Sequence, residues 1–187
     1  VIGNDLDEIK SRLKNFSQKI KNKKFLVTGG AGFLGSWFCD VVIAMGGKVT
    51  CVDNLSSGSK KNIRHLLKNK NFEFIKADVT NFTTRKKYDY IVHMASIASV
   101  PLYQKYPVET LDANVIGTRN MLELARKIKV KAMLFTSTSE VYGDAKVIPT
   151  PETYWGNVNP YGPRSMYDEG KRAAEAYCYA YWKKYKV

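Results

Sequence analysis

Cysteine and histidine are scarce in this sequence of 187 residues, which contains three cysteines and two histidines. Cys39, Cys51 and Cys178 are odd in number and widely separated, which does not fit a framework of disulfide bonds. His65 and His93 do not stand at metal-ligand spacing from each other or from the cysteines. We therefore expect reduced, mostly buried thiols and no metal site.

Long hydrophobic runs are also missing. No apolar run approaches the ~20 residues that a membrane-spanning helix needs. The first residues do not have the cationic and then apolar order of a secretion signal, because Asn4, Asp5, Asp7 and Glu8 occupy those places. We therefore expect a cytoplasmic protein with no membrane partner.

Acidic residues are too few to balance the basic ones: 30 lysines and arginines face 17 aspartates and glutamates, which gives a formal net charge of +13. A charge of this size invites a nucleic-acid hypothesis. The lysines are nevertheless scattered over residues 10–24, 60–76, 127–131 and 183–186, and no recognised nucleic-acid motif accompanies them. We therefore expect a solvated basic surface that attracts a small anionic substrate, and no nucleic-acid partner.

Segments typical of strands and helices alternate along the chain, which has 44% apolar residues and is long enough to bury a core. Residues 1–23 form an expected extension with an amphipathic helix at 5–22. The domain proper, residues 24–187, has expected strands at 24–28, 48–52, 72–76, 88–93 and 131–136, and expected helices at 33–45, 60–68, within 102–128 and from 163 onward. This alternation predicts an α/β fold with a doubly wound parallel sheet of the Rossmann type.

The turn between the first expected strand and helix carries glycines at G-x-x-G-x-x-G spacing. Side chains at these positions would hold a pyrophosphate away from the backbone amides and from the helix N-terminus. We therefore predict that this turn binds a dinucleotide cofactor through Gly29, Gly32, Phe33, Leu34 and Gly35.

Short polar segments follow the next three strands, at the edge of a parallel sheet where ligands collect. The Asp53 carboxylate could accept hydrogen bonds from the ribose hydroxyls of a cofactor, which favours NAD over NADP. The alternative for Asp53 and Asn54 is an ordinary turn at the end of a strand. The cofactor-binding candidates from these segments are Asp53, Asn54, Asp78, Val79, Ala95 and Ser96.

Tyr167 and Lys171 are the strongest candidates for chemistry. In a helix their spacing places the phenol and the ammonium on one face, one turn apart. The lysine charge then favours the phenolate, so that the tyrosine can act as a base beside the cofactor. The alternative is a packed helical aromatic residue with a surface lysine.

The segment after the fifth expected strand, residues 136–143, brings hydroxyls and one carboxylate to the same edge. We predict that Thr138, Ser139 and Glu140 belong to the catalytic site, with Glu140 as a candidate acid or base. The alternative for Glu140 is a solvated turn residue.

The motifs TGGAGFLGS, HMAS, TSTSEVYG and YWGNVNPYGPRSMYDEGKRAAE resemble those of the extended short-chain dehydrogenases that act on nucleotide sugars, most closely the UDP-glucuronate decarboxylases. The likeness spans about residues 24–187. It implies NAD as the cofactor, a nucleotide-sugar substrate such as a UDP-sugar, and a C-terminal substrate domain that this chain does not include. It also implies a homodimer through the helices at about 103–128 and 165–186.

The resemblance also implies a role for individual residues. Tyr167 would be the base, and Lys171 would be its partner and a ligand of the cofactor ribose. Thr138 would hydrogen-bond the sugar oxygen, and Glu140 would lie near the neighbouring carbon. Asn114 would contact the cofactor or the substrate.

The reaction that this family relationship implies is decarboxylation of UDP-glucuronate to UDP-xylose through a 4-keto intermediate. A 4,6-dehydratase, whose motif has an aspartate where Ser139 stands here, and a 4-epimerase, which needs no carboxylate at Glu140, are the alternatives. A non-catalytic NAD-binding subunit or fragment is a further one. We expect the 187-residue chain alone to be incomplete for turnover.

Overall fold

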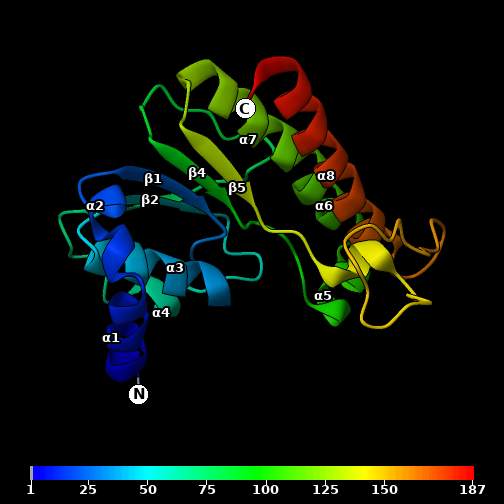
Figure 1. Cartoon of the computed structure of the whole chain (residues 1–187), viewed down its shortest axis with the longest axis horizontal. Coiled ribbons are helices and arrows are strands. Elements are labelled where there is room, and N and C mark those ends of the chain that lie inside the picture. The colour runs from blue at the N-terminus through cyan, green and yellow to red at the C-terminus, as the bar shows by residue number, and fades with distance from the viewer. Residues whose placement is uncertain (1) are drawn as a thin grey trace.

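Five parallel strands form one sheet in the order β3-β2-β1-β4-β5 in the computed structural model, which describes residues 2–187 (Figure 1). The strands are β1 (Lys24–Thr28), β2 (Lys48–Asp53), β3 (Phe72–Lys76), β4 (Tyr90–His93) and β5 (Ala132–Phe135). The chain reverses its direction of winding between β1 and β4, which is the place where doubly wound sheets bind ligands. The predicted α/β fold with a doubly wound parallel sheet is therefore confirmed.

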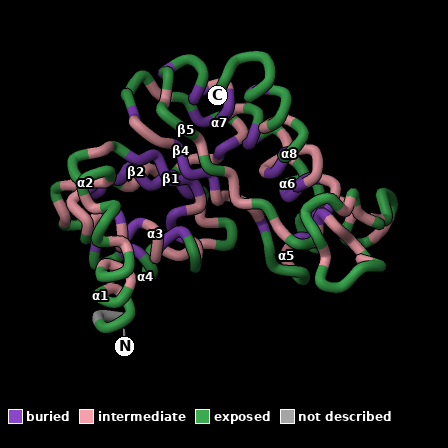
Figure 2. Tube along the Cα trace, viewed as in Figure 1, coloured by how far each residue is buried: buried purple, intermediate pink, exposed green. Residues whose placement is uncertain are grey.

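Each face of the sheet is buried by its own helices, because successive side chains of a strand point to opposite faces. Phe25 and Val27 pack with Cys39 and Val42 of α3 (Phe33–Ala44) on one face. Leu26, between them in β1, packs on the other face in a cluster that contains four residues of α7 (Thr118–Ile128): Met121, Leu124, Ala125 and Ile128. Figure 2 shows the buried stretches concentrated along these strands.

The helical segment predicted within 102–128 begins at Val100 and consists of four pieces. They are α5 (Val100–Lys105), α6 (Pro107–Asp112), the π-helical turn η2 (Ala113–Gly117) and α7. Pro107 has no N–H to continue a helix, and Tyr106 before it leaves the helical region with φ −125° and ψ 62°. The interruption at Pro107 was foreseeable from the sequence, whereas the π turn was not.

The last helix, α8 (Ser165–Tyr185), agrees with the helix predicted from about residue 163. It lies beside α6 (Figure 1). The short helical turn η3 (Ser139–Tyr142) lies between β5 and α8 in the chain. The helix predicted at 60–68 is too long, because α4 (Lys60–Ile63) is followed by turns, although Leu66 still reaches the core.

The single helix predicted at 5–22 is wrong. The segment contains α1 (Ile2–Arg12), a 3-10 turn at Lys14–Phe16 and α2 (Ser17–Ile20). Apolar spacing indicates which residues face the protein, but it cannot show whether the helix is continuous. The break allows α1 to lie against α3 while Ile20 packs on the core under α3. Within residues 2–187, no helix has the length and apolar character required to cross a bilayer.

Candidate active site

A cavity of about 690 Å³ lies at the carboxyl ends of the strands and joins most of the residues predicted from the sequence. This volume is in the range of small-molecule sites. Its lining includes the predicted Gly29, Gly32, Phe33, Leu34, Gly35, Asp53, Asn54, Asp78, Val79, Ala95, Ser96, Tyr167 and Lys171. Cofactor candidates and the tyrosine and lysine of the helical pair therefore share one cavity.

The glycine turn has the shape that an approaching anion needs. Gly29 has φ +70°, and a Cβ there would lie 2.7 Å from the backbone nitrogen of Ala95, so that only glycine allows β1 and the end of β4 to come this close. Gly32 is the N-cap of α3 and provides no side-chain cap. The first amides of α3 consequently remain available to a pyrophosphate.

Asp53 at the end of β2 is only 7% exposed and is held by two backbone amides. Its Oδ2 accepts a hydrogen bond from the Ala31 N–H at 2.9 Å, and its Oδ1 accepts one from the Leu55 N–H at 2.8 Å. A carboxylate has about four acceptor positions, so two remain for ribose hydroxyls. The turn and the cofactor interpretations of Asp53 are thus compatible, because the carboxylate fixes the glycine turn and also lines the cavity.

Asn54 and Asp78 connect the loops that follow β2 and β3. The Asn54 amide Nδ2 donates to Asp78 Oδ2 at 2.8 Å, and Asp78 Oδ1 accepts from the Thr80 N–H and hydroxyl at 2.9 and 2.7 Å. Burial opposes ionisation of Asp78, but the hydrogen bonds from Thr80 and Asn54 outweigh it and lower the pKa of this carboxyl. Asp78 therefore adds a fixed negative charge to the cavity wall beside Val79.

Lys171 reaches from α8 to the end of β5. It is 3% exposed, and its Nζ donates to the backbone oxygen of Thr136 at 2.8 Å. The same Nζ lies 4.7 Å from the ring centroid of Phe135 and 5.9 Å from that of Tyr167. Burial lowers the pKa of Lys171 to about 8, so the side chain remains mostly an ammonium at neutral pH. The predicted juxtaposition of phenol and ammonium is present in the structure.

His93 at the end of β4 is enclosed behind this pair. Its Nδ1 lies 2.6 Å from the Thr28 hydroxyl oxygen, and its Nε2 lies 3.1 Å from that of Thr118. Burial and, to a smaller extent, the charge of Lys171 lower the pKa of His93 to about 3. The ring is therefore neutral and holds β1, β4 and α7 together.

Asn114 does not line the cavity, although the resemblance implies that it contacts the cofactor or the substrate. It is fully buried in the π turn, where its Oδ1 accepts a hydrogen bond from the Ser96 hydroxyl at 2.8 Å. A Cβ on Gly170 would lie 3.1 Å from the Asn114 Cβ, so this glycine lets α8 approach the π turn. Asn114 thus reaches the cavity through Ser96, which lines it.

Thr138, Ser139 and Glu140 also lie outside the lining of this cavity. The chain turns into η3 at this point, and the Thr138 hydroxyl accepts a hydrogen bond from the Glu140 N–H at 3.3 Å. The Glu140 carboxylate forms an ion pair with Arg164, whose Nε also lies 3.6 Å from Asp168 Oδ2. Glu140 is thus a partly exposed carboxylate in a short helical turn, paired with Arg164, and its catalytic role stays a prediction.

The lining contains further residues that the sequence interpretation missed. Ser56, Ser57 and Gly58 follow β2, and Thr136 and Ser137 follow β5, so the rule that ligands lie beyond strand ends could have found them. The remaining ones are Ala77, Met94, Ile97, Ala98, Ser99, Leu102, Tyr106, Glu109 and Ala113. Those on α5, α6 and η2 come to the cavity through tertiary packing that no local pattern indicates. In the described part of the chain, no group of three or more histidine, cysteine, aspartate or glutamate side chains could hold a metal.

A doubly wound sheet with a glycine turn, an acid after β2 and a tyrosine and lysine in one cavity defines a dinucleotide-binding α/β domain. Residues 25–187 match the NAD dependent epimerase/dehydratase family, and the chain belongs to this family. Its members depend on NAD.

Two similar relatives are UDP-glucuronic acid decarboxylases. UDP-glucuronic acid decarboxylase 1 of Xenopus tropicalis is 47% identical over 186 residues, which are 95% of this chain and 44% of the relative. The protein of the same name from Danio rerio is 50% identical over 171 residues, which are 91% of this chain and 40% of the relative. This chain therefore spans less than half the length of these two relatives.

Among solved structures, the UDP-glucose 4-epimerase of Thermotoga maritima, determined with UDP-glucose, is 34% identical and superposes with a TM-score of 0.77. The match covers 88% of this chain and 52% of that structure. The fold of this chain thus corresponds to about one half of a nucleotide-sugar enzyme.

Proposed function

We propose that this chain is the NAD-binding half of an enzyme that decarboxylates UDP-glucuronate to UDP-xylose. The observation that carries the proposal is the placement of Tyr167 and Lys171 in the same cavity as the glycine turn and Asp53. The relatives of 47% and 50% identity are UDP-glucuronic acid decarboxylases, which supports this substrate over other nucleotide sugars.

The residues of the cavity fit NAD. The free amides at the start of α3 suit its pyrophosphate, and the remaining acceptor positions of Asp53 suit the adenosine ribose. Lys171 would hold the other ribose. When bound, NAD supplies a hydride acceptor that is returned to its starting state at the end of the cycle.

Tyr167 acts as the base in this proposal. Its phenolate removes the proton of the sugar 4-hydroxyl as that carbon loses a hydride, and the neighbouring ammonium of Lys171 stabilises the phenolate. The Thr138 hydroxyl, which accepts from the Glu140 amide, keeps its own proton to donate to the sugar oxygen. The result is a ketone at carbon 4, beta to the carboxylate.

A carboxylate beta to a ketone can leave as carbon dioxide, because the electrons of the broken carbon–carbon bond flow into an enolate. The Tyr167 phenol and the Thr138 hydroxyl stabilise the enolate oxygen by hydrogen bonds. Glu140, which forms an ion pair with Arg164, relays a proton from solvent to the adjacent carbon. Return of the hydride to carbon 4 and of the proton from Tyr167 to its oxygen completes the pentose.

Epimerisation at carbon 4 is the second candidate, since the solved structure of 34% identity is a UDP-glucose 4-epimerase. It needs the same oxidation but no loss of a carboxylate. A 4,6-dehydratase would require an acid to expel the 6-hydroxyl, and Ser139 occupies the place of the aspartate that supplies it. A chain that only binds NAD is the remaining alternative.

We also propose that the protein associates with a second copy of itself. Val108 and Leu111 of α6, Ile116 of η2, and Tyr179 and Trp182 of α8 are exposed. These residues lie on neighbouring helices, because α6, η2 and α8 pack together (Figure 1). Sedimentation equilibrium should show that the parent chain is a dimer and that the double variant Leu111→Glu, Trp182→Glu is a monomer. A monomeric parent chain would contradict the proposal.

The experiment for the main proposal has two parts. Calorimetric titration should show that the 187-residue chain binds NAD⁺, and absence of binding would refute the cofactor assignment. A chimera would then join this chain to the residues that follow the matched region in the Xenopus tropicalis relative. Given UDP-glucuronate and NAD⁺, it should release carbon dioxide and UDP-xylose, whereas the chain alone should release little.

The Tyr167→Phe chimera is the matched control. It should retain NAD⁺ binding, which shows that it is folded, and lose at least about 100-fold in the rate of carbon dioxide release. From UDP-glucuronate, a product that keeps its carboxylate and has inverted carbon 4 would identify an epimerase. From UDP-glucose, whose 6-hydroxyl can leave, a product that has lost water would identify a dehydratase. Either product would refute the decarboxylase proposal.

A further inference from the structure

A second cavity, of about 440 Å³, lies at the opposite edge of the sheet from the candidate active site. Its lining comes from residues at the amino ends of strands, including Lys24 of β1, Lys48 of β2 and Phe72 of β3, and from the segments before β3 and β4. It shares no lining residue with the candidate active site. The amino-end cavity is therefore a separate feature of the fold.

The amino-end cavity is strongly basic. Among the described residues, its lining contains one carboxylate, Glu73, and five lysines, which are Lys24, Lys48, Lys70, Lys86 and Lys87. The ion pairs within residues 2–187 engage only Lys86 of these five. Asp89, immediately before β4, pairs with Lys131 at 3.0 Å and accepts a hydrogen bond from the Lys24 backbone N–H, so it is already engaged.

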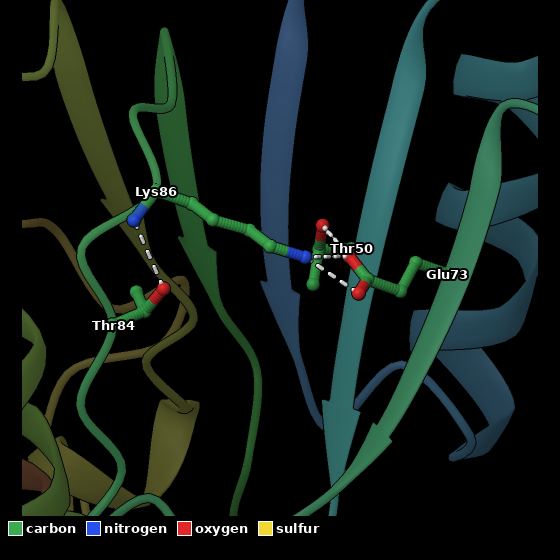
Figure 3. A network of polar contacts seen from close by, with 4 residues as sticks. All are labelled: Thr50, Glu73, Thr84 and Lys86. Atoms are coloured by element: carbon green, nitrogen blue, oxygen red, sulfur yellow. Dashed lines mark hydrogen bonds and ion pairs between the residues drawn. The ribbon is translucent and has the colours of Figure 1, made fainter.

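The Lys86 ammonium is fixed in place. Its Nζ donates to both oxygens of Glu73, at 2.6 and 2.7 Å, and Glu73 also accepts a hydrogen bond from the Thr50 hydroxyl at 3.1 Å. Figure 3 shows the Lys86 side chain extended toward Glu73 of β3 and Thr50 of β2, with its backbone N–H directed to the Thr84 hydroxyl. The hydrogen bonds from Lys86 contribute most to a lowered pKa of Glu73. One lysine of the lining is thus ordered by strand residues.

Tyr88 provides an independent indication of a ligand. It lines the amino-end cavity and is 7% exposed, and its hydroxyl has no hydrogen-bond partner among residues 2–187. A buried hydroxyl without a partner is unfavourable, because it has lost its hydrogen bonds to water. The phenol makes a minor contribution to the raised pKa of Lys86, after that of Glu73, which is consistent with its position beside this ammonium. An anion in the cavity would supply the missing acceptor.

We propose that the amino-end cavity binds the phosphate chain of a small polyanion. Lysine ammoniums are compact, rotatable donors that bind phosphate as point charges, and four of the five form no ion pair with any residue from 2 to 187. The lining also contains the buried Phe25, Val49 and Phe72. The Tyr88 hydroxyl donates to a phosphate oxygen.

Inorganic triphosphate is the probe for this site. Isothermal titration of the 187-residue chain, with NAD⁺ present to fill the candidate active site, should show saturable binding of triphosphate that weakens as salt is added. Lys48→Ala and Lys70→Ala should each weaken it roughly threefold to tenfold, as loss of one partly exposed charge contact does. Lys127→Ala, a lysine of α7 outside the cavity, is the matched control and should leave it unchanged.

Tyr88→Phe tests the geometry rather than the charge. Because the hydroxyl has no partner, its removal should not lower the melting temperature of the ligand-free chain, yet it should weaken triphosphate binding. Titration with ATP in place of triphosphate distinguishes a nucleotide from a free phosphate chain. If only the phosphate chain is recognised, Tyr88→Phe should weaken the binding of ATP and of triphosphate by the same factor. Absence of binding, or equal loss in the Lys127→Ala control, would overturn the proposal and leave only the diffuse charge of the surface.

Discussion

The rings of Tyr103 and Tyr167 lie nearly parallel, with centroids 5.3 Å apart and an angle of 9° between their planes. Tyr103 is on α5 and is 1% exposed, and Tyr167 is in the first turn of α8. Together with Ile97 they form a small buried cluster that is separate from the two cores of the sheet. The ring proposed to act as the base is therefore positioned by a residue distant from it in the chain.

Replacing Tyr103 separates the contribution of its ring from that of its hydroxyl. The hydroxyl has no hydrogen-bond partner within residues 2–187, so Tyr103→Phe should not lower the free energy of unfolding. Tyr103→Ala removes the stacked ring and should lower it by about 3–5 kcal/mol. Urea unfolding of both variants measures these values, and equal losses would show that the hydroxyl and not the stack matters.

Lys171 should make the stability of the chain depend on pH in the alkaline range. Its pKa is lowered from 10.5 to about 8 in the folded chain, so between these values the unfolded chain binds more protons and stability rises with pH. Relative to a Lys171→Met variant, the parent chain should gain up to about 3 kcal/mol between pH 8 and pH 10.5. Urea unfolding at several pH values gives this difference, and a constant difference would contradict the burial of a charged lysine.

His93 should have the corresponding effect in acid. Its pKa is lowered from 6.5 to about 3 on folding, so the unfolded chain takes up a proton that the folded chain excludes as the pH falls through this range. The parent chain should lose up to about 5 kcal/mol between pH 6.5 and pH 3 through this group. A His93→Gln variant should lack this component, and an identical acid dependence of both chains would disprove it.

Asp53→Asn should affect both stability and cofactor binding. An amide oxygen can still accept from the Ala31 N–H, but the amide nitrogen would face the Leu55 N–H, so we expect a loss of about 1–3 kcal/mol in the free energy of unfolding. NAD⁺ should also bind at least about tenfold more weakly, because the glycine turn loses its anchor and the ribose an acceptor. Asp144→Asn, at an exposed position outside the cavity, is the control. Unchanged NAD⁺ affinity in Asp53→Asn would count against the predicted cofactor site.

The sequence was sufficient to predict that the glycine turn, Asp53, Tyr167 and Lys171 lie in one cavity, because each signal there is local. The glycines, Asp53 and the helical pair of Tyr167 and Lys171 each follow from short spacings, and the rule for parallel sheets then brings them to one edge. The strands were predicted within a few residues for the same reason, since β-branched and apolar residues mark them directly.

Other features depend on contacts between distant segments and left no local pattern. The π turn at Asn114 inserts an extra residue into a helical path. The Asn114 side chain lies behind the cavity lining and contacts Ser96, which is part of that lining. The stack of Tyr103 on Tyr167 joins α5 to α8, and the amino-end cavity collects residues from the starts of separate strands. In the N-terminal segment, the apolar spacing likewise predicted which side of the helix faces the protein, but it did not predict that the helix ends at Arg12.

One continuous helix, α8, connects the candidate active site to an exposed pair of aromatic residues. Its 21 residues correspond to about 30 Å, with Tyr167 and Lys171 near one end and the exposed Tyr179 and Trp182 toward the other. A tilt of about 2° over this length shifts one end by about 1 Å, and a misplacement of ~1 Å is enough to slow catalysis by about two orders of magnitude. A contact made by Tyr179 or Trp182 near the C-terminal end of α8 would therefore influence the position of the Tyr167 phenol near the start of the helix.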